Sequence, residues 1–145
     1  MKLVDLYNSF WEQSKDNILN NNYFIDNYLN ATNDNRRGIT LLARPEKNVL
    51  KNIQYFIDKC KIIEPDQYYY RNSEIHTTIL TIISCYEGFK LDLINIENYI
   101  KIIKKALFNT KKFKIQFKGI TSSDSCIMIQ GFPLDNTIEI IRNNL

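Results

Sequence analysis

The sequence predicts an α+β fold, in which an N-terminal helical segment precedes a lobe with the order β-α-β-α-β-β-α and a mostly antiparallel sheet. Three observations predict it. Apolar residues recur at helical spacing in some segments, whereas other segments alternate or are continuously apolar. Proline and clusters of turn-forming residues separate these segments. A short turn, TSSDS, joins two of the strand segments.

Four segments carry apolar residues at the spacing of one helix face. The first extends from residue 2 to about residue 21, and the second begins near Glu46. Asp92 is expected to cap the third, and the last extends to Leu145. Their apolar faces comprise, in order, Leu3, Leu6, Tyr7, Phe10 and Trp11; Val49, Ile53, Phe56 and Cys60; Ile96, Ile100, Ile103 and Leu107; and Leu134, Ile138, Ile141 and Leu145.

The strands are read from composition and alternation. GITLLARP, residues 38 to 45, is rich in β-branched residues and stops at a proline, which predicts a buried strand. EIHTTILTIIS predicts a second strand, and CIMIQGFP, apolar on both faces, predicts an interior one. Residues 111 to 131 are expected to form a hairpin through TSSDS. Its first strand alternates, with Phe113, Ile115 and Phe117 packed on a helix and Lys112, Lys114, Gln116 and Lys118 on the other side.

Composition bounds the functional classes. A chain of 145 residues, 44% hydrophobic, suits a single globular domain. The formal net charge of +3 tolerates a phosphate-bearing ligand without requiring one. No apolar run resembles a signal peptide or a membrane span. The three cysteines are far apart and form no zinc motif, so we expect a cytoplasmic protein with reduced thiols: Cys60, Cys85 and Cys126.

The stretch EIHTTILTII, residues 74 to 83, contains the only histidine. Alternate residues of a strand share a face, so His76 and Thr78 are expected side by side, with Ile75, Thr77 and Ile79 facing the other way. An imidazole exchanges protons near neutral pH, and a neighbouring hydroxyl can hold a phosphate oxygen. The pair therefore suits phosphate chemistry. The alternative is a structural histidine, partly buried and bonded to a carbonyl.

Three stretches in this order, GITLLARP, EPDQYYYRNSEIHTTILTIIS and FKIQFKGITSSDSCIMIQGFP, resemble the 2H phosphoesterase superfamily. That superfamily contains the 2'-5' RNA ligase-like proteins and the 2',3'-cyclic phosphodiesterases. The resemblance covers residues 38 to 145, and the N-terminal helix has no obvious equivalent in it. It therefore divides the chain into an N-terminal helical extension, residues 1–35, and a 2H phosphoesterase-like lobe, residues 36–145.

The resemblance implies two H-x-[ST] motifs, one in each of two lobes that face a shared groove. Their histidines act as general base and general acid on a cyclic phosphate or a phosphodiester, their hydroxyls bind the phosphate, and neither a metal nor another cofactor is required. It gives His76 the catalytic role and Thr78 the phosphate-binding role. The implied partner is a nucleotide or RNA with a 2',3'-cyclic phosphate or a 2'-5' linkage.

This sequence departs from the family pattern because the second motif is absent. Three interpretations remain open: a truncated or interrupted chain, a short form that kept a binding groove without catalysis, or a homodimer in which each copy supplies one His76. We expect weak or no activity from a single chain, and self-association through residues 126 to 145 or the N-terminal helix. The other class of hypothesis is a non-catalytic nucleotide-binding, RNA-binding or interaction domain with a structural His76.

Five further residues are possible substrate contacts, each with a structural alternative. The tyrosines that precede the histidine strand can stack on a base or pack against the lobe. The basic residues can bind a phosphate or remain solvated, and those on the hairpin can protect a sheet edge. These candidates are Tyr68, Tyr70, Arg71, Lys114 and Lys118.

Overall fold

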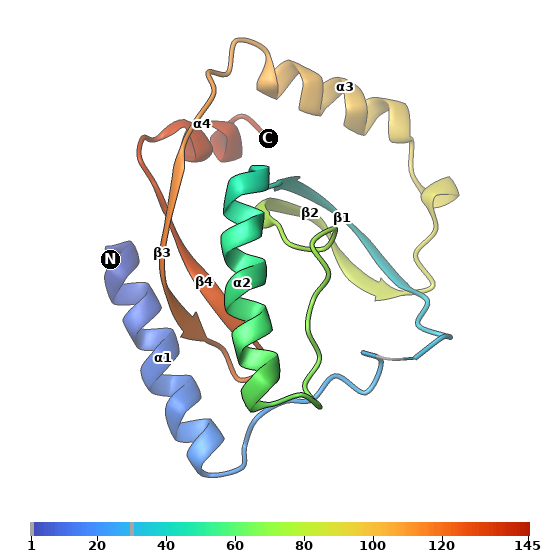
Figure 1. The fold of residues 1–145 in the computed structure, drawn as a ribbon. Helices are drawn as coiled ribbons and strands as arrows, with labels where there is room; N and C mark the ends of the chain where they lie inside the picture. Colours follow the sequence, from blue (N-terminus) through green and yellow to red (C-terminus); the bar gives the residue numbers. More distant parts are fainter. Residues whose placement is uncertain (1, 30) are drawn as a thin grey trace. The chain divides into compact units, whose positions relative to one another are not determined.

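The computed structural model describes residues 2–29 and 31–145 (Figure 1). Their four strands pair antiparallel, as β1 with β2 and β3 with β4. The order of elements after the first helix is the one that the sequence predicts, so the α+β fold is confirmed, although the strands form two small sheets. The elements are α1 (Leu3–Leu19), β1 (Arg36–Ala43), α2 (Lys47–Ile63), β2 (Thr77–Glu87), the 3₁₀ turn η1 (Leu91–Leu93), α3 (Ile96–Leu107), β3 (Ile115–Ser122), β4 (Ile127–Pro133) and α4 (Thr137–Asn143).

The chain forms two compact units. One consists of residues 36–93 and contains β1, α2 and β2. The other combines residues 1–35 with residues 94–145, so α1 belongs to the same unit as α3, the β3-β4 hairpin and α4.

Three bulges shape strand β2. Thr78 lies opposite Leu42 and Leu80 opposite Leu41, so Ile79 between them has no partner residue of its own. A second extra residue falls between Thr81 and Ile83, and a third between Ile83 and Tyr86. Burial follows this irregularity, because Ile79 is only 3% exposed and Leu80 is half-buried, whereas the threonines on either side are exposed. The bulges therefore turn extra apolar side chains to the buried side of the strand.

Gly38 allows the two strands of this sheet to lie close together. A Cβ atom at this position would come within 2.5 Å of the carbonyl oxygen of Ile83 and 2.9 Å of the backbone nitrogen of Cys85. Backbone atoms cannot move aside as a flexible side chain can, so any larger residue would separate β1 from β2 here.

Helix α2 begins at Lys47, as the sequence predicts. Its expected apolar face is confirmed, because Ile53 is buried and Val49, Phe56 and Cys60 are half-buried. Two isoleucines at its last positions, Ile62 and Ile63, are exposed. The stripe is therefore covered along most of the helix but not at its end.

The hairpin of the other unit is also confirmed, although β3 begins at Ile115 rather than at residue 111. The lysine face is exposed, and Phe113, Ile115 and Phe117 are half-buried. A bulge interrupts β3 after Phe117, at a position where Gly119 adopts a φ of 85°. The expectation that β4 is interior on both faces is wrong. Strand β4 is half-buried at its centre and Ile127 is exposed, because its sheet has only two strands.

Polar contacts fix α1 to this hairpin. The Tyr7 hydroxyl donates to the carbonyl of Gly131 (2.9 Å) and accepts from its N–H (3.0 Å). The Thr121 hydroxyl donates to the carbonyl of Tyr7 (2.9 Å), and the hydroxyls of the buried Ser14 and Ser122 share a hydrogen bond. The apolar stripe predicted for α1 is only partly covered, since Trp11 is 47% exposed.

Helix α3 is capped by Asn95, whose side-chain oxygen accepts from the N–H of Asn98 (3.1 Å). The expected cap by Asp92 is wrong, because Asp92 lies in the η1 turn before the helix. In α4, Ile138 and Ile141 are buried, as its predicted apolar face requires.

Candidate functional site

His76 lies in an exposed position immediately before β2, at the end of a hydrogen-bonded loop. Within this loop the N–H of Glu74 donates to the carbonyl of Arg71 (2.8 Å), and the N–H of Arg71 donates to the Glu74 carboxylate (2.7 Å). The Arg44 guanidinium donates to the carbonyl of Ser73. These bonds fix the backbone from which His76 projects.

The His76 ring is oriented by a hydrogen bond between its Nδ1 and the carbonyl oxygen of Glu74 (2.5 Å). A carbonyl oxygen only accepts, so the proton of the neutral ring resides on Nδ1. The Nε2 atom then carries the lone pair. An exposed imidazole held in this tautomer can take a proton from a bound nucleophile.

Exposure alternates along this segment, as the sequence predicts. His76 and Thr78 are exposed, whereas Ile75 and Thr77 are half-buried and Ile79 is buried. Within the part of the chain that the structure describes, the Thr78 hydroxyl makes no hydrogen bond, so it is available to a ligand. The cross-strand neighbour Leu42 adds an exposed apolar side chain beside it.

The tyrosines before His76 differ in their contacts. The rings of Tyr68 and Tyr70 meet edge to face, with centroids 5.1 Å apart, and both are exposed. Tyr69 instead donates its hydroxyl to the carbonyl of Glu64 (2.8 Å), which ties the loop to the end of α2. Desolvation of the phenol, followed by repulsion from Cys60 and Glu64, raises the pKa of Tyr69. Tyr69 therefore has a structural role in the loop.

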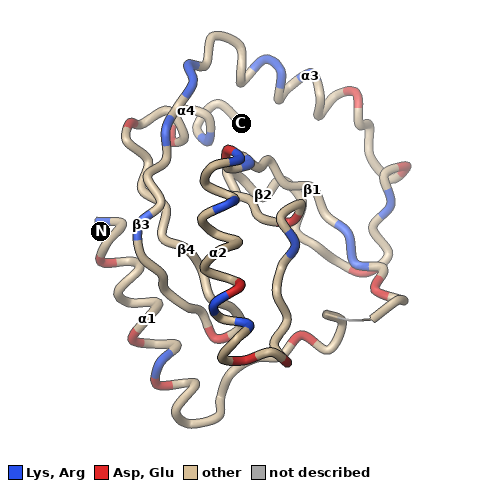
Figure 2. The backbone as a smooth tube through the Cα atoms, viewed as in Figure 1, with Lys and Arg blue, Asp and Glu red and all other residues tan. Residues whose placement is uncertain are grey.

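The remaining candidates divide between the two units. Tyr68, Tyr70 and Arg71 belong to the unit of His76. Lys114 and Lys118 belong to the other unit, where both are exposed on the hairpin, Lys114 just before β3 and Lys118 at its bulge. Basic and acidic positions are distributed over both units (Figure 2).

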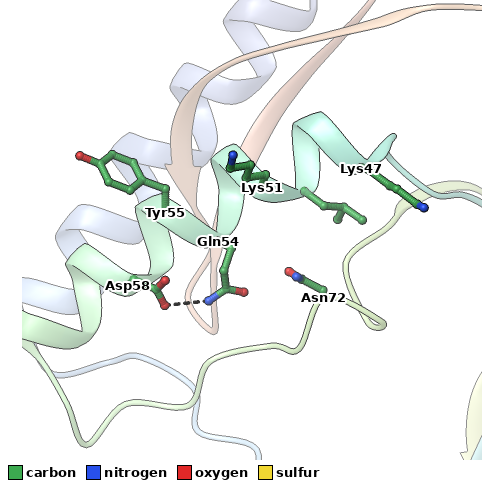
Figure 3. A pocket seen from close by; sticks show the side chains of 7 residues that line it. Lys47, Lys51, Gln54, Tyr55, Asp58 and Asn72 are labelled. Carbon is green, nitrogen blue, oxygen red and sulfur yellow. Dashed lines mark hydrogen bonds between the residues drawn. The ribbon is translucent and has the colours of Figure 1, made fainter.

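The structure adds a feature that sequence reasoning missed. An open hollow of about 510 Å³ lies along α2, with one wall from the loop at Asn72 (Figure 3). The spacing of its helical residues could have indicated a common face, because they recur every three or four positions. The lining residues are Lys47, Leu50, Lys51, Gln54, Tyr55, Asp58 and Asn72.

Within residues 2–29 and 31–145, no group of three or more His, Cys, Asp or Glu side chains is arranged to hold a metal ion. No helix in this part of the chain has the length and apolar character needed to cross a membrane.

Comparison with known proteins identifies no relative. No family model, no curated protein and no solved structure matches this chain. The residues and their geometry are therefore the basis for a functional assignment.

Proposed function

We propose that this chain is a 2H phosphoesterase-like protein that hydrolyses or transesterifies a 2',3'-cyclic phosphate or a 2'-5' phosphodiester by histidine acid/base chemistry. The observation that carries the proposal is the exposed pair at the start of β2. His76 is held through Nδ1 by the carbonyl of Glu74, and Thr78, two residues further along the chain, is also exposed, with its hydroxyl available. The order of elements agrees with the resemblance stated above.

In the hydrolytic reaction, Nε2 of His76 takes a proton from water as the water oxygen bonds to phosphorus. The bond from phosphorus to one ribose oxygen breaks, and a general acid protonates that oxygen to give a nucleoside monophosphate. The Thr78 hydroxyl donates to a non-bridging phosphate oxygen. His76 cannot supply the acid in the same step. His76 is the only histidine of this sequence, so a single copy of residues 1–145 does not supply the second imidazole that the resemblance implies.

We propose a second copy of the chain as one source of that imidazole, within a cytoplasmic homodimer whose ligand is a nucleotide or RNA. Exposed apolar side chains on the predicted contact segments support this association: Leu3, Phe10, Trp11, Ile127 and Leu134. Sedimentation at micromolar concentration tests it. A monomer at all concentrations would remove the dimeric site from the proposal.

The activity test uses the purified chain in excess over 2',3'-cyclic AMP, with EDTA present. We expect slow opening of the cyclic phosphate, at a rate that rises with protein concentration. His76→Ala removes the base and should reduce the rate by about 10²–10⁴-fold, or to the uncatalysed rate if that is reached first. Thr78→Val should slow the reaction, whereas Thr81→Val, an exposed threonine of the same strand, should not.

Two outcomes separate the proposal from its alternative. Opening that persists unchanged in His76→Ala would contradict the proposed chemistry. Absence of opening, with binding of the cyclic nucleotide that depends on His76 and Thr78, would favour a non-catalytic nucleotide-binding module.

A further inference from the structure

The hollow on α2 has the chemistry of a binding site separate from His76. Six of its seven lining residues lie on α2, at positions 47, 50, 51, 54, 55 and 58, so they span three turns of one helix face. Asn72 faces them from the loop (Figure 3). The hollow is therefore elongated along the helix, with different groups at its two ends.

One end of the hollow is positively charged. Lys47 is the first residue of α2 and Lys51 lies one turn further along. Within the described residues, neither ammonium group is within 4.0 Å of a carboxylate. Both lie near the helix N-terminus, where the backbone dipole also favours an anion. The N-cap residue Glu46 is not among the lining residues.

The carboxylate at the other end is already engaged. Asp58 accepts a hydrogen bond from the Gln54 side chain (2.8 Å) and pairs with Lys61 (3.6 Å). Its charge is partly compensated there, and it lies two turns from Lys51. An anionic ligand is therefore attracted to the lysine end.

An aromatic ring lies next to the cationic end. Tyr55 is 64% exposed, and it projects from the same side of α2 as Lys51 (Figure 3). The Lys59 ammonium lies 4.5 Å from the ring centroid, which leaves the opposite ring face for a flat group. Residues four apart on a helix have Cβ atoms about 5–6 Å apart, a separation that one nucleotide can bridge.

We infer that this hollow binds a nucleotide. Lys51 holds its phosphate, and Lys47 adds a second positive charge at the same end of the helix. The base stacks on Tyr55, and the Asn72 amide hydrogen-bonds to the ribose or the base edge. This site does not need His76. It goes beyond the proposed function because it binds a nucleotide without transforming it.

The test is a titration of the ¹⁵N-labelled chain with AMP, followed by backbone amide shifts. The double variant K47Q/K51Q should raise the dissociation constant at least about tenfold, because a charge-assisted contact and a neighbouring positive charge are both lost. The matched control K101Q/K105Q removes two exposed lysines with the same spacing from α3, and it should bind as the unchanged chain does.

Further ligands and variants separate the contributions. Tyr55→Leu should weaken AMP binding and leave binding of inorganic phosphate unaltered, and adenosine should bind more weakly than AMP. His76→Ala should bind AMP normally. If K47Q/K51Q binds AMP as tightly as the control, or if binding is lost only in His76→Ala, the inference is overturned. The second outcome would leave the proposed function in place.

Discussion

Different kinds of internal contact stabilise the two compact units. In residues 36–93 the buried residues are apolar, and the polar side chains of the candidate site are exposed. In the unit of α1 and the hairpin, the most completely buried side chains are Thr121 and Ser14. There a helix and a sheet from opposite ends of the chain meet through hydroxyl groups. One unit depends mainly on apolar burial, and the other also on satisfied buried polar groups.

The two-stranded sheet of residues 36–93 has both buried apolar and exposed polar side chains. A two-stranded sheet is only marginally stable by itself, so each sheet requires packing from another element. In residues 36–93 the bulges of β2 turn apolar side chains inward and leave Thr78 and Thr81 exposed. Buried apolar residues and exposed hydroxyl groups thus belong to the same strand.

The largest predicted effect tests apolar burial. Ile79→Ala should lower the free energy of unfolding by about 2–5 kcal/mol, because it leaves a cavity behind the most buried isoleucine of β2. The matched control is Ile82→Ala, at the half-buried extra residue of the second bulge, where a smaller loss is expected. Urea denaturation measures both. Equal losses would show that the core of this unit is not centred on Ile79.

A smaller effect tests the buried hydroxyl pair. Ser14→Ala should cost about 1–3 kcal/mol, because the hydroxyl of Ser122 is left buried without its partner. The double variant S14A/S122A should recover part of this loss, since both polar groups are then removed. Ser9→Ala, at an exposed serine of the same helix, is the control. Additive losses in a double-mutant cycle would contradict the pairing.

The smallest effect depends on pH. Hydrogen bonds from the side chain and then the backbone of Thr137 lower the pKa of Asp135 from its ordinary value of 3.8. A depressed pKa stabilises the folded state above 3.8, and this contribution is lost as the pH falls through the folded-state value. Asp135→Asn should therefore be slightly less stable than the unchanged chain at neutral pH, and the difference should close in acid. A difference that grows in acid would contradict the assigned sign.

The sequence predicts the features that leave a local pattern. Helical stripes predict α1, α2 and α4, and alternation predicts both the hairpin and the exposure of His76 and Thr78. The contact of Ser14 with Ser122 joins residues 108 positions apart and has no local signature. The cap at Asn95 depends on where η1 ends, which Asp92 alone does not indicate.

The hollow on α2 could not be predicted from a local sequence pattern either. Its helix face is regular, but its wall depends on the position of the loop at Asn72. The side-chain hydrogen bonds that hold this loop, from Tyr69 to Glu64 and from Arg44 to Ser73, follow no sequence motif. Periodicity therefore predicts which residues share a face of an element, whereas the sites formed where a loop meets that face require the structure.

The proposed role of His76 can be tested directly, because the single histidine is its own probe. Long-range ¹H–¹⁵N NMR of the ¹⁵N-labelled chain observes one imidazole and needs no assignment. We expect a neutral ring protonated at Nδ1, as the bond to Glu74 requires, and a shift of the Nε2 signal when 2',3'-cyclic AMP is added. Thr78→Val should weaken that response, and Thr81→Val should not. A ring protonated at Nε2 alone would contradict the proposed role of His76. So would an Nε2 signal that does not shift at a saturating concentration of the cyclic nucleotide.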